Sequence, residues 1–192
     1  MKRFFILFVL ASMVSCKSRK TGAESVEKFQ VENLVQILES GELRNRFPDA
    51  QIKEGKDLFD EGTAERPFTI LYPGTPDELW VTWINHNKKE VHQIRFEKDG
   101  RWKTKEGIRI GTPYEELLKL NGSPVTVYGF GWDYSGAVNW NEGKMSDTDI
   151  RVFLSPAGDP PAKFIGDSPI NPTAEELNSL DLKVGAVVLQ NE

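Results

Sequence analysis

Histidine and acidic side chains are the groups of this sequence that could perform acid–base or metal chemistry. The chain has two histidines, His86 in "NHNKK" and His92 in "EVHQIRF". If Asn85 pairs with Glu90 around a four-residue loop, the two imidazoles do not face each other, so a shared metal ion or proton relay is not expected. Positions at the surface and at the rim of a strand face account for both histidines better than a catalytic role.

Carboxylates are numerous, but they form no recognisable catalytic or metal-binding motif. Asp147 and Asp149 in "SDTD" could supply oxygens to calcium, yet the segment lacks the glycine and distal glutamate of an EF-hand loop. Phosphate-binding loops, GxSxG, HExxH and CxxC motifs are also absent from the sequence. We therefore expect no catalytic residues, metal or cofactor. A glycan or cell-wall hydrolase with scattered carboxylates stays open as an alternative.

The segment "VTVYGFGWDYSGAVNW", residues 125–140, is unusually rich in aromatic residues and glycine. "DYSG" predicts a type I turn with Gly136 in the left-handed region, and the resulting three-residue loop places Phe130 opposite Trp140. A two-residue loop would place Trp140 opposite Gly131 instead. The favoured register gathers five side chains on one face, namely Tyr128, Phe130, Trp132, Val138 and Trp140.

This aromatic face is expected to be chiefly core, because each buried aromatic ring removes a large apolar area from water. Any part of it that is exposed becomes a candidate surface for a protein partner. Two further candidates, Trp80 and Arg95, lie on predicted strands. The candidate partner-binding residues are therefore Trp80, Arg95, Tyr128, Trp132, Tyr134 and Trp140.

Cys16 is the only cysteine, which excludes a disulfide within one chain. It follows Lys2, Arg3 and the apolar run "FFILFVLASMV", which is typical of a signal peptide and too short to span a bilayer comfortably. "MVSC", residues 13–16, resembles the lipobox of bacterial lipoproteins. The resemblance implies removal of residues 1–15 and acylation of Cys16, which would anchor the protein to a membrane. An ordinary secretory signal with an incidental cysteine is the alternative.

The residues after the cysteine indicate where the protein is anchored. Lys17, in place of aspartate, looks like an outer-membrane sorting signal, and "KSRK" lacks the acidic residues associated with surface export. We therefore expect the periplasmic face of the outer membrane. Removing residues 1–15 takes away Lys2 and Arg3 and changes the net charge from −5 to −7. This acidic balance argues against nucleic-acid binding.

The elements that must position these side chains form one α+β domain over residues 26–192, after a flexible tether at 16–25. The pattern predicts two units, about 26–104 and 105–192, each with helices followed by antiparallel strands, and with the helices on one face of the sheet. Helices are expected before Ser40-Gly41, within "GELRNRF", from an N-cap at Thr112 to Asn121-Gly122, and after the capping box of Thr173 and Glu176.

The strands carry the other predicted positions. Pairing of "ELWVTWIN" with "EVHQIRF" puts Leu79, Val81 and Trp83 on a core face with His92, Ile94 and Phe96. Trp80 then lies opposite Arg95 on the other face, where a cation–π contact is open to it. The last strand, "LDLKVGAVVLQ", is expected to bury one face made of Leu182, Val184, Ala186 and Val188.

The lipobox-like segment and "IRIGTPYEELLKLNGSPVTVYG" together resemble the BamE-like outer-membrane lipoproteins and the β-lactamase inhibitor proteins. Gly129 to Tyr134 also look like the "GFGWDYGG" hairpin of uncharacterised lipoproteins, although Ser135 departs from it. The resemblance implies a non-enzymatic protein-binding or envelope-assembly lipoprotein, with an inhibitor of an envelope enzyme as a rival. An open, concave sheet lined by aromatics would favour binding, whereas two facing carboxylates of perturbed pKa would favour the hydrolase.

Overall fold

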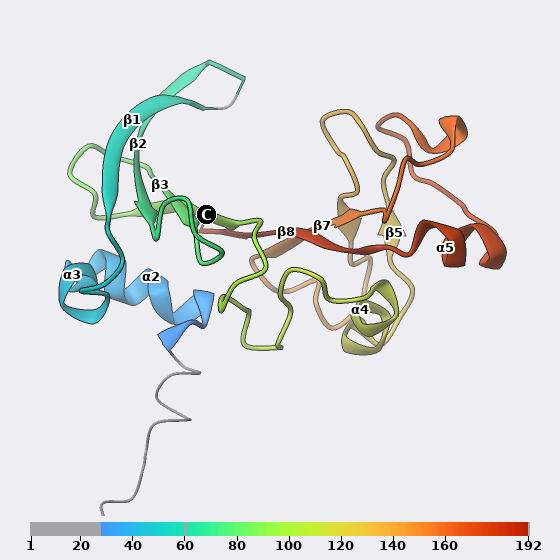
Figure 1. Ribbon diagram of the computed structural model, residues 1–192, viewed down its shortest axis with the longest axis horizontal. Coiled ribbons are helices and arrows are strands. Elements are labelled where there is room, and N and C mark those ends of the chain that lie inside the picture. Colours follow the sequence, from blue (N-terminus) through green and yellow to red (C-terminus); the bar gives the residue numbers. More distant parts are fainter. Residues whose placement is uncertain (1–27, 60, 192) are drawn as a thin grey trace, which may run out of the picture.

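The computed structural model describes residues 28–59 and 61–191, and the expected signal peptide, lipobox and Cys16 lie outside this part. The chain forms a six-stranded antiparallel sheet, a small two-stranded sheet and several helices. Helices α2, α3 and α4 lie along one face of the large sheet (Figure 1). The predicted α+β class, with helices on one face of the sheet, is confirmed.

The helical elements are α2 (Val31–Glu39), α3 (Leu43–Arg46), α4 (Tyr114–Asn121), α5 (Ala174–Leu180) and the 3-10 turn η1 (Ala162–Phe164). The strands are β1 (Lys53–Phe59), β2 (Ala64–Leu71), β3 (Leu79–Trp83), β4 (Val91–Phe96), β5 (Thr126–Val127), β6 (Val138–Asn139), β7 (Ile150–Ser155) and β8 (Lys183–Gln190). The large sheet has the order β1-β2-β3-β4-β8-β7, and β5 pairs with β6. The pairing of β4 with β8 thus joins strands from the two expected units into one sheet.

The helix ends follow the predicted capping chemistry with one exception. Gly122 ends α4 in the left-handed conformation, and Thr173 and Glu176 form the complete capping box of α5. Thr112, however, is not the N-cap of α4, which starts one residue later after Pro113. The Thr112 carbonyl accepts a hydrogen bond from the backbone of Val184, which holds this residue against β8, and its hydroxyl oxygen accepts from the Arg109 amide instead of capping α4.

The β3–β4 hairpin has the predicted register over most of its length. Trp80 lies opposite Arg95 and Val81 opposite Ile94, as expected. A bulge between Thr82 and Trp83 then places Trp83 opposite Val91 instead of His92. The expectation that His92 shares the core face is therefore wrong, because the extra residue turns its side chain away from that face.

The last strand is buried on both faces rather than one. The β7–β8 register shifts between Phe153 and Leu154, and beyond this shift Val187 and Leu189 face the main core. Ala186 and Val188 are buried on the opposite face, outside that core. The predicted single face is therefore wrong, since the bulge reverses the alternation part-way along β8.

The main core lies between the sheet and the helices, and the opposite sheet face has a second, smaller set of buried side chains. Core residues with no exposure include Leu34 of α2, Ile94 of β4 and Leu117 of α4. Phe68, Ile70, Ala186 and Val188 are also buried, but they do not belong to this core cluster. The sheet face opposite the helices is therefore apolar along its centre, although none of the described helices covers it (Figure 1).

Candidate functional site

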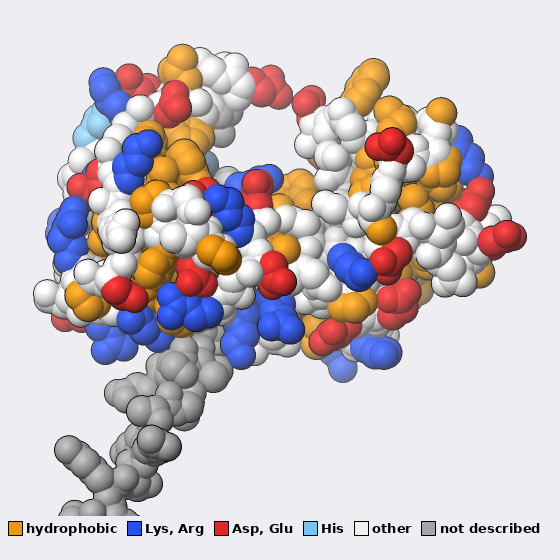
Figure 2. All heavy atoms as spheres, viewed as in Figure 1, with side chains coloured by type: hydrophobic (Ala, Val, Ile, Leu, Met, Phe, Trp, Pro, Cys, Tyr) orange, Lys and Arg blue, Asp and Glu red, His pale blue; other side chains and the backbone are white. Residues whose placement is uncertain are grey.

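A groove crosses the sheet face opposite the helices. It consists of three adjoining hollows of about 560, 310 and 310 Å³, all lined by Arg95. Figure 2 shows the molecular outline hollowed here, between the β1–β2 hairpin and the loops of the C-terminal half. We call this feature the sheet groove.

Trp80 forms part of the floor of the sheet groove. Its ring is half-buried and packs at a tilt against Phe68, with 5.3 Å between ring centres. The indole Nε1 donates to Glu78 Oε1 at 3.4 Å, and Lys98 Nζ lies 3.1 Å from the same oxygen. A hydrogen bond from the backbone N–H of Gly74 is the main cause that lowers the pKa of Glu78. Glu78 is therefore held ionised, and it helps to fix the orientation of the indole.

Arg95 lies beside Trp80 but makes its aromatic contact elsewhere. Its guanidinium carbon lies 5.4 Å from the ring centre of Phe153 on β7, and its Nε pairs with Glu97. The side chain can cross β8 because that strand carries the small residue Ala186 opposite Phe153. The predicted position of Arg95 is confirmed, whereas its cation–π partner is Phe153.

One side of the groove is lined by residues of the loop 129–136, which we call the rim loop. The Gly136 amide donates to the Gly129 carbonyl at 2.8 Å and closes the loop. Inside it, the Ser135 amide donates to the Trp132 carbonyl at 3.0 Å, and the Tyr134 amide donates to Asp167 Oδ1 at 3.0 Å. The loop is therefore held in shape by its own backbone and by the segment that follows η1.

Both predicted hairpin registers are wrong. Val127 pairs with Val138, so the loop is longer than two or three residues. The reason is a long-range contact: the Phe130 amide donates to the Phe164 carbonyl at 2.9 Å, and the Phe130 carbonyl accepts from Gly166 at 3.0 Å. The backbone of the Pro/Gly-rich segment thus takes the place that residues 138–140 were expected to fill. The expected left-handed conformation of Gly136 is present, with φ of 71°.

The aromatic residues of this region divide between core and surface. Phe130 and Trp140 are buried, and the Trp140 indole donates to the Ile150 carbonyl at 2.9 Å. Trp140 is therefore not available to a partner, which corrects its place among the candidates. Trp132 is 65% exposed, so the expectation of a core face does not hold for it. Tyr134, which was expected in the loop, is 56% exposed.

Two further apolar side chains, Tyr128 and Ile165, lie next to the rim loop. Tyr128 is half-buried and stacks on Tyr134, with 5.5 Å between ring centres. Ile165 is 47% exposed and lines the groove together with Phe130 and Asp133. Figure 2 shows hydrophobic side chains gathered over this part of the molecule. The structure thus brings four predicted candidates to the groove or its rim loop, namely Trp80, Arg95, Trp132 and Tyr134, and a fifth, Tyr128, packs against that loop.

Phe153 and Ile165 also line the groove, although neither was predicted as a site residue. In β7, Phe153 lies between the core residues Val152 and Leu154, so its side chain points to the sheet face opposite the core. The two-residue period of a strand could have indicated this. Ile165 lies in an irregular Pro/Gly-rich segment, where no period places a side chain. Its position depends on the bridge to Phe130, which only the folded chain reveals.

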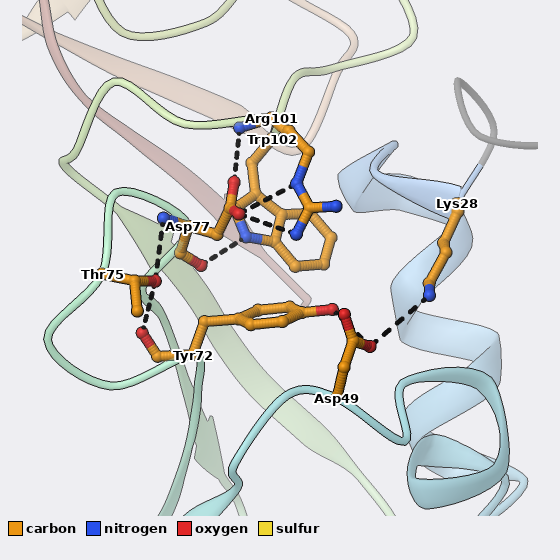
Figure 3. Close-up of polar contacts among 7 residues, drawn as sticks. All are labelled: Lys28, Asp49, Tyr72, Thr75, Asp77, Arg101 and Trp102. Carbon is orange, nitrogen blue, oxygen red and sulfur yellow. Dashed lines mark hydrogen bonds and ion pairs between the residues drawn. The ribbon is translucent and has the colours of Figure 1, made fainter. Parts of the chain in front are cut away.

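A polar cluster beside α2 is the other concentration of charged groups (Figure 3). Asp77 accepts hydrogen bonds from Arg101 Nε at 2.9 Å and from the Arg101 backbone amide at 2.7 Å, and Arg101 Nη2 lies 2.7 Å from Asp77 Oδ2 in an ion pair. Burial acts to raise the pKa of Asp77, but the hydrogen bonds from Arg101 outweigh it and the pKa is lowered. The Asp77 carbonyl also accepts from the Trp102 indole at 2.8 Å, so the ion pair is tied to a buried ring.

Tyr72 continues this cluster from an unusual backbone conformation. Its φ is 52°, in the left-handed region, and its hydroxyl donates to Asp49 Oδ1 at 3.1 Å. Burial and then the hydrogen bond to Asp49 raise the pKa of Tyr72 to about 12. Because these groups form hydrogen bonds and ion pairs with one another, the cluster holds the turn that leads into β3 and thereby positions Trp80.

The two aspartates of the "SDTD" segment lie together at a small hollow. Asp147 and Asp149 line a space of about 140 Å³ with Glu32 and Glu106. Burial raises the pKa of Glu32, whose oxygens accept from the Lys105 backbone at 3.0 and 3.1 Å. Across residues 28–59 and 61–191, no group of three or more potential ligands is arranged to hold a metal ion.

Comparison with known proteins gives a similar solved structure but no function. No protein-family model matches the chain. No curated protein matches it either. Among solved structures it is similar to the uncharacterized protein yfeY from Escherichia coli, with 14% identity and a TM-score of 0.48, over 77% of this chain and 88% of that chain. In the described part of the chain, no helix has the length and apolarity needed to cross a membrane.

Proposed function

We propose that this chain is a lipid-anchored envelope protein that binds a protein partner in the sheet groove and performs no catalysis itself. The observation that carries the proposal is an open groove with Trp80, Arg95 and Phe153 on its floor and the exposed Trp132 in its rim loop. Tryptophan, tyrosine and arginine are the residue types most enriched where protein partners bind tightly.

Two acids of the groove, Glu78 and Glu97, support binding rather than hydrolysis. A glycosidase needs one carboxyl group whose pKa is raised so that it can donate a proton. Here Glu78 has a lowered pKa and lies 3.1 Å from Lys98, and Glu97 pairs with Arg95. The alternative of a hydrolase with scattered carboxylates gains no support from this arrangement.

The proposed location depends on the N-terminal sequence. The lipobox resemblance supports acylation at Cys16, and Lys17 supports the outer membrane with the domain on the periplasmic side. The likeness of residues 108–129 to BamE-like lipoproteins supports a role in envelope assembly. Two or three acyl chains would hold the protein stably at the membrane without a transmembrane helix.

The inhibitor alternative is favoured by one observation, the shape of the rim loop. Trp132 and Tyr134 are exposed on a loop that is closed by the Gly129–Gly136 hydrogen bond and held by Asp167. A preordered loop with exposed aromatic side chains loses little entropy when it enters the cleft of another protein. Loss of inhibition of an envelope enzyme by Trp132→Ala would identify this mode of action.

A crosslinking pull-down from native envelopes tests the proposed function. The native chain should recover a specific protein, and Trp132→Ala should reduce that recovery by about tenfold or more, as expected for an aromatic hot spot. Lys119→Ala on the exposed surface of α4 is the matched control and should retain the partner. Equal recovery with both variants would contradict the proposal.

A further inference from the structure

We propose that two copies of this chain associate edge to edge through β1, forming a continuous antiparallel sheet. β1 is the outermost strand of the six-stranded sheet, and residues 53–58 are all exposed. An outer strand presents unpaired backbone groups on one side, which makes it a template for pairing with another strand. This inference does not depend on the function proposed for the groove.

In one register, each charged side chain of β1 lies opposite a side chain of the opposite charge in the second copy. When a two-fold axis passes through Gly55, Lys53 lies opposite Asp57 of the second copy, and Glu54 lies opposite Lys56 of the second copy. The symmetry repeats each pair, so four oppositely charged pairs form along the contact. Gly55 meets Gly55 of the second copy at the centre, where no side chains collide.

The same register covers an exposed apolar side chain. Leu58 is a large apolar side chain on the outermost strand, and it is 61% exposed. With the axis at Gly55, it lies opposite Ile52 of the second copy, a partly buried residue that packs against the main core. Directly opposed residues of an antiparallel pair point to the same face, so Leu58 gains an apolar neighbour.

Neighbouring registers place like charges together. Moving the axis to Lys56 puts two lysines opposite each other. Moving it the other way, to Glu54, puts two glutamates opposite each other. Like charges directly opposite in a ladder are destabilising, so the register centred on Gly55 is selected.

The charges that β1 uses are accessible in the single chain. Lys56 Nζ lies 3.0 Å from Glu65 Oε1, but both side chains are about half-exposed or more, at 64% and 47%. Such exposed pairs contribute little and can be shared with a second partner. Glu54 similarly lies 3.0 Å from Lys88 Nζ and 3.6 Å from Arg44 Nη2, with 43% of its side chain exposed.

Charge reversal at two positions tests the dimer and its register. In Lys53→Glu alone, the new glutamate faces Asp57 of the second copy, and in Asp57→Lys alone, the new lysine faces Lys53. Each variant should dimerise at least about tenfold more weakly than the native chain, since two attractive pairs become repulsive. When the two variants are mixed, both contacts become attractive again, and a mixed dimer should form.

The measurement is sedimentation equilibrium of the full-length chain in detergent, over a wide concentration range. The native chain should show a monomer–dimer equilibrium, and the variants should associate only with each other when differently tagged. Lys119→Glu and Glu142→Lys, with the same charge changes at exposed sites outside β1, should dimerise normally. Circular dichroism checks that each variant is folded.

Three results would overturn the inference. A native chain that stays monomeric at every concentration would leave β1 to a different occupant, such as an extended segment of another protein. A dimer that Lys53→Glu and Asp57→Lys do not weaken would lie elsewhere on the molecule. Failure of the mixed variants to associate, while each is folded, would exclude the register centred on Gly55.

Discussion

Arg95 on β4 lies over Phe153 on β7, with 5.4 Å between the guanidinium carbon and the ring centre, although β8 runs between the two strands. The contact links the strands of the N-terminal half to those of the C-terminal half, on the sheet face that the helices of residues 28–59 and 61–191 leave uncovered (Figure 1). It also places a cationic side chain at the junction of the three hollows that form the sheet groove. The groove is therefore a product of both halves of the chain.

Trp132 and Trp140 should behave oppositely when replaced by alanine. Trp132 is 65% exposed, so its loss should change the free energy of unfolding by less than about 0.5 kcal/mol while weakening partner binding. Trp140 is buried and hydrogen-bonded to Ile150, so its loss should cost about 3–5 kcal/mol. Urea denaturation of both variants measures the difference, and equal destabilisation would contradict the placement of these rings.

Gly136 should not tolerate a side chain. Its φ is 71°, and an added Cβ would lie 2.0 Å from the Leu154 carbonyl oxygen. We expect Gly136→Ala to lower the free energy of unfolding by at least about 2 kcal/mol and to disorder the rim loop. Gly158→Ala is the matched control, because nothing lies within 4 Å of its Cβ position. Similar stability of the two variants, measured by thermal unfolding, would argue against the rim-loop geometry.

The Asp77–Arg101 pair should stabilise the fold in a pH-dependent manner. The pKa of Asp77 is lowered in the folded state, so its contribution is complete above the unfolded-state pKa of about 3.9 and is lost as the pH falls through the folded-state pKa. Asp77→Asn should cost about 1–2 kcal/mol at neutral pH, an amount limited by solvent screening of the half-exposed Arg101.

Denaturation at pH 7 and pH 3 measures this effect. The difference in stability between the native chain and Asp77→Asn should narrow at pH 3. Glu65→Gln, at the exposed pair with Lys56, should change stability little at either pH. A gap for Asp77→Asn that is unchanged or wider at pH 3 would show that the pKa of Asp77 is not lowered by folding.

The predicted acylation is tested separately at Cys16. In Cys16→Ala the protein should leave the membrane fraction, and its mass should lack the lipid, because anchoring depends on the acyl chains. The matched control, Ser15→Ala, keeps a small residue before the cysteine and should stay in the membrane fraction. Unchanged fractionation and mass of Cys16→Ala would refute the lipoprotein interpretation.

Local sequence predicted the parts of the fold that local chemistry determines. The stop at Gly122, the capping box at Thr173 and the pairing of Trp80 with Arg95 all follow from residue types and loop length. The bulge that displaces His92 could not be counted in advance, because a single inserted residue leaves no mark in the hydrophobic pattern.

The candidate site was predicted less completely because it is assembled from distant segments. Trp80 and Trp132 stood out by residue type, but their relation depends on how Phe164 and Gly166 bind the backbone of Phe130. This contact joins the rim loop to an irregular segment with no period of its own. Turn chemistry alone favoured a shorter loop, which placed Trp140 opposite Phe130 and on the same face as Trp132, whereas Trp140 is buried and Trp132 is exposed.

Site-specific photo-crosslinking in native envelopes tests the central claim most directly. A photoreactive residue at Ile165, which lines the sheet groove and is 47% exposed, should give one discrete crosslinked species with a protein other than this chain. The same residue at Lys119, on the exposed surface of α4, should not give that species. Trp80→Ala combined with the Ile165 probe should reduce the product about tenfold. No product at Ile165, or the same product from Lys119, would contradict a partner-binding groove.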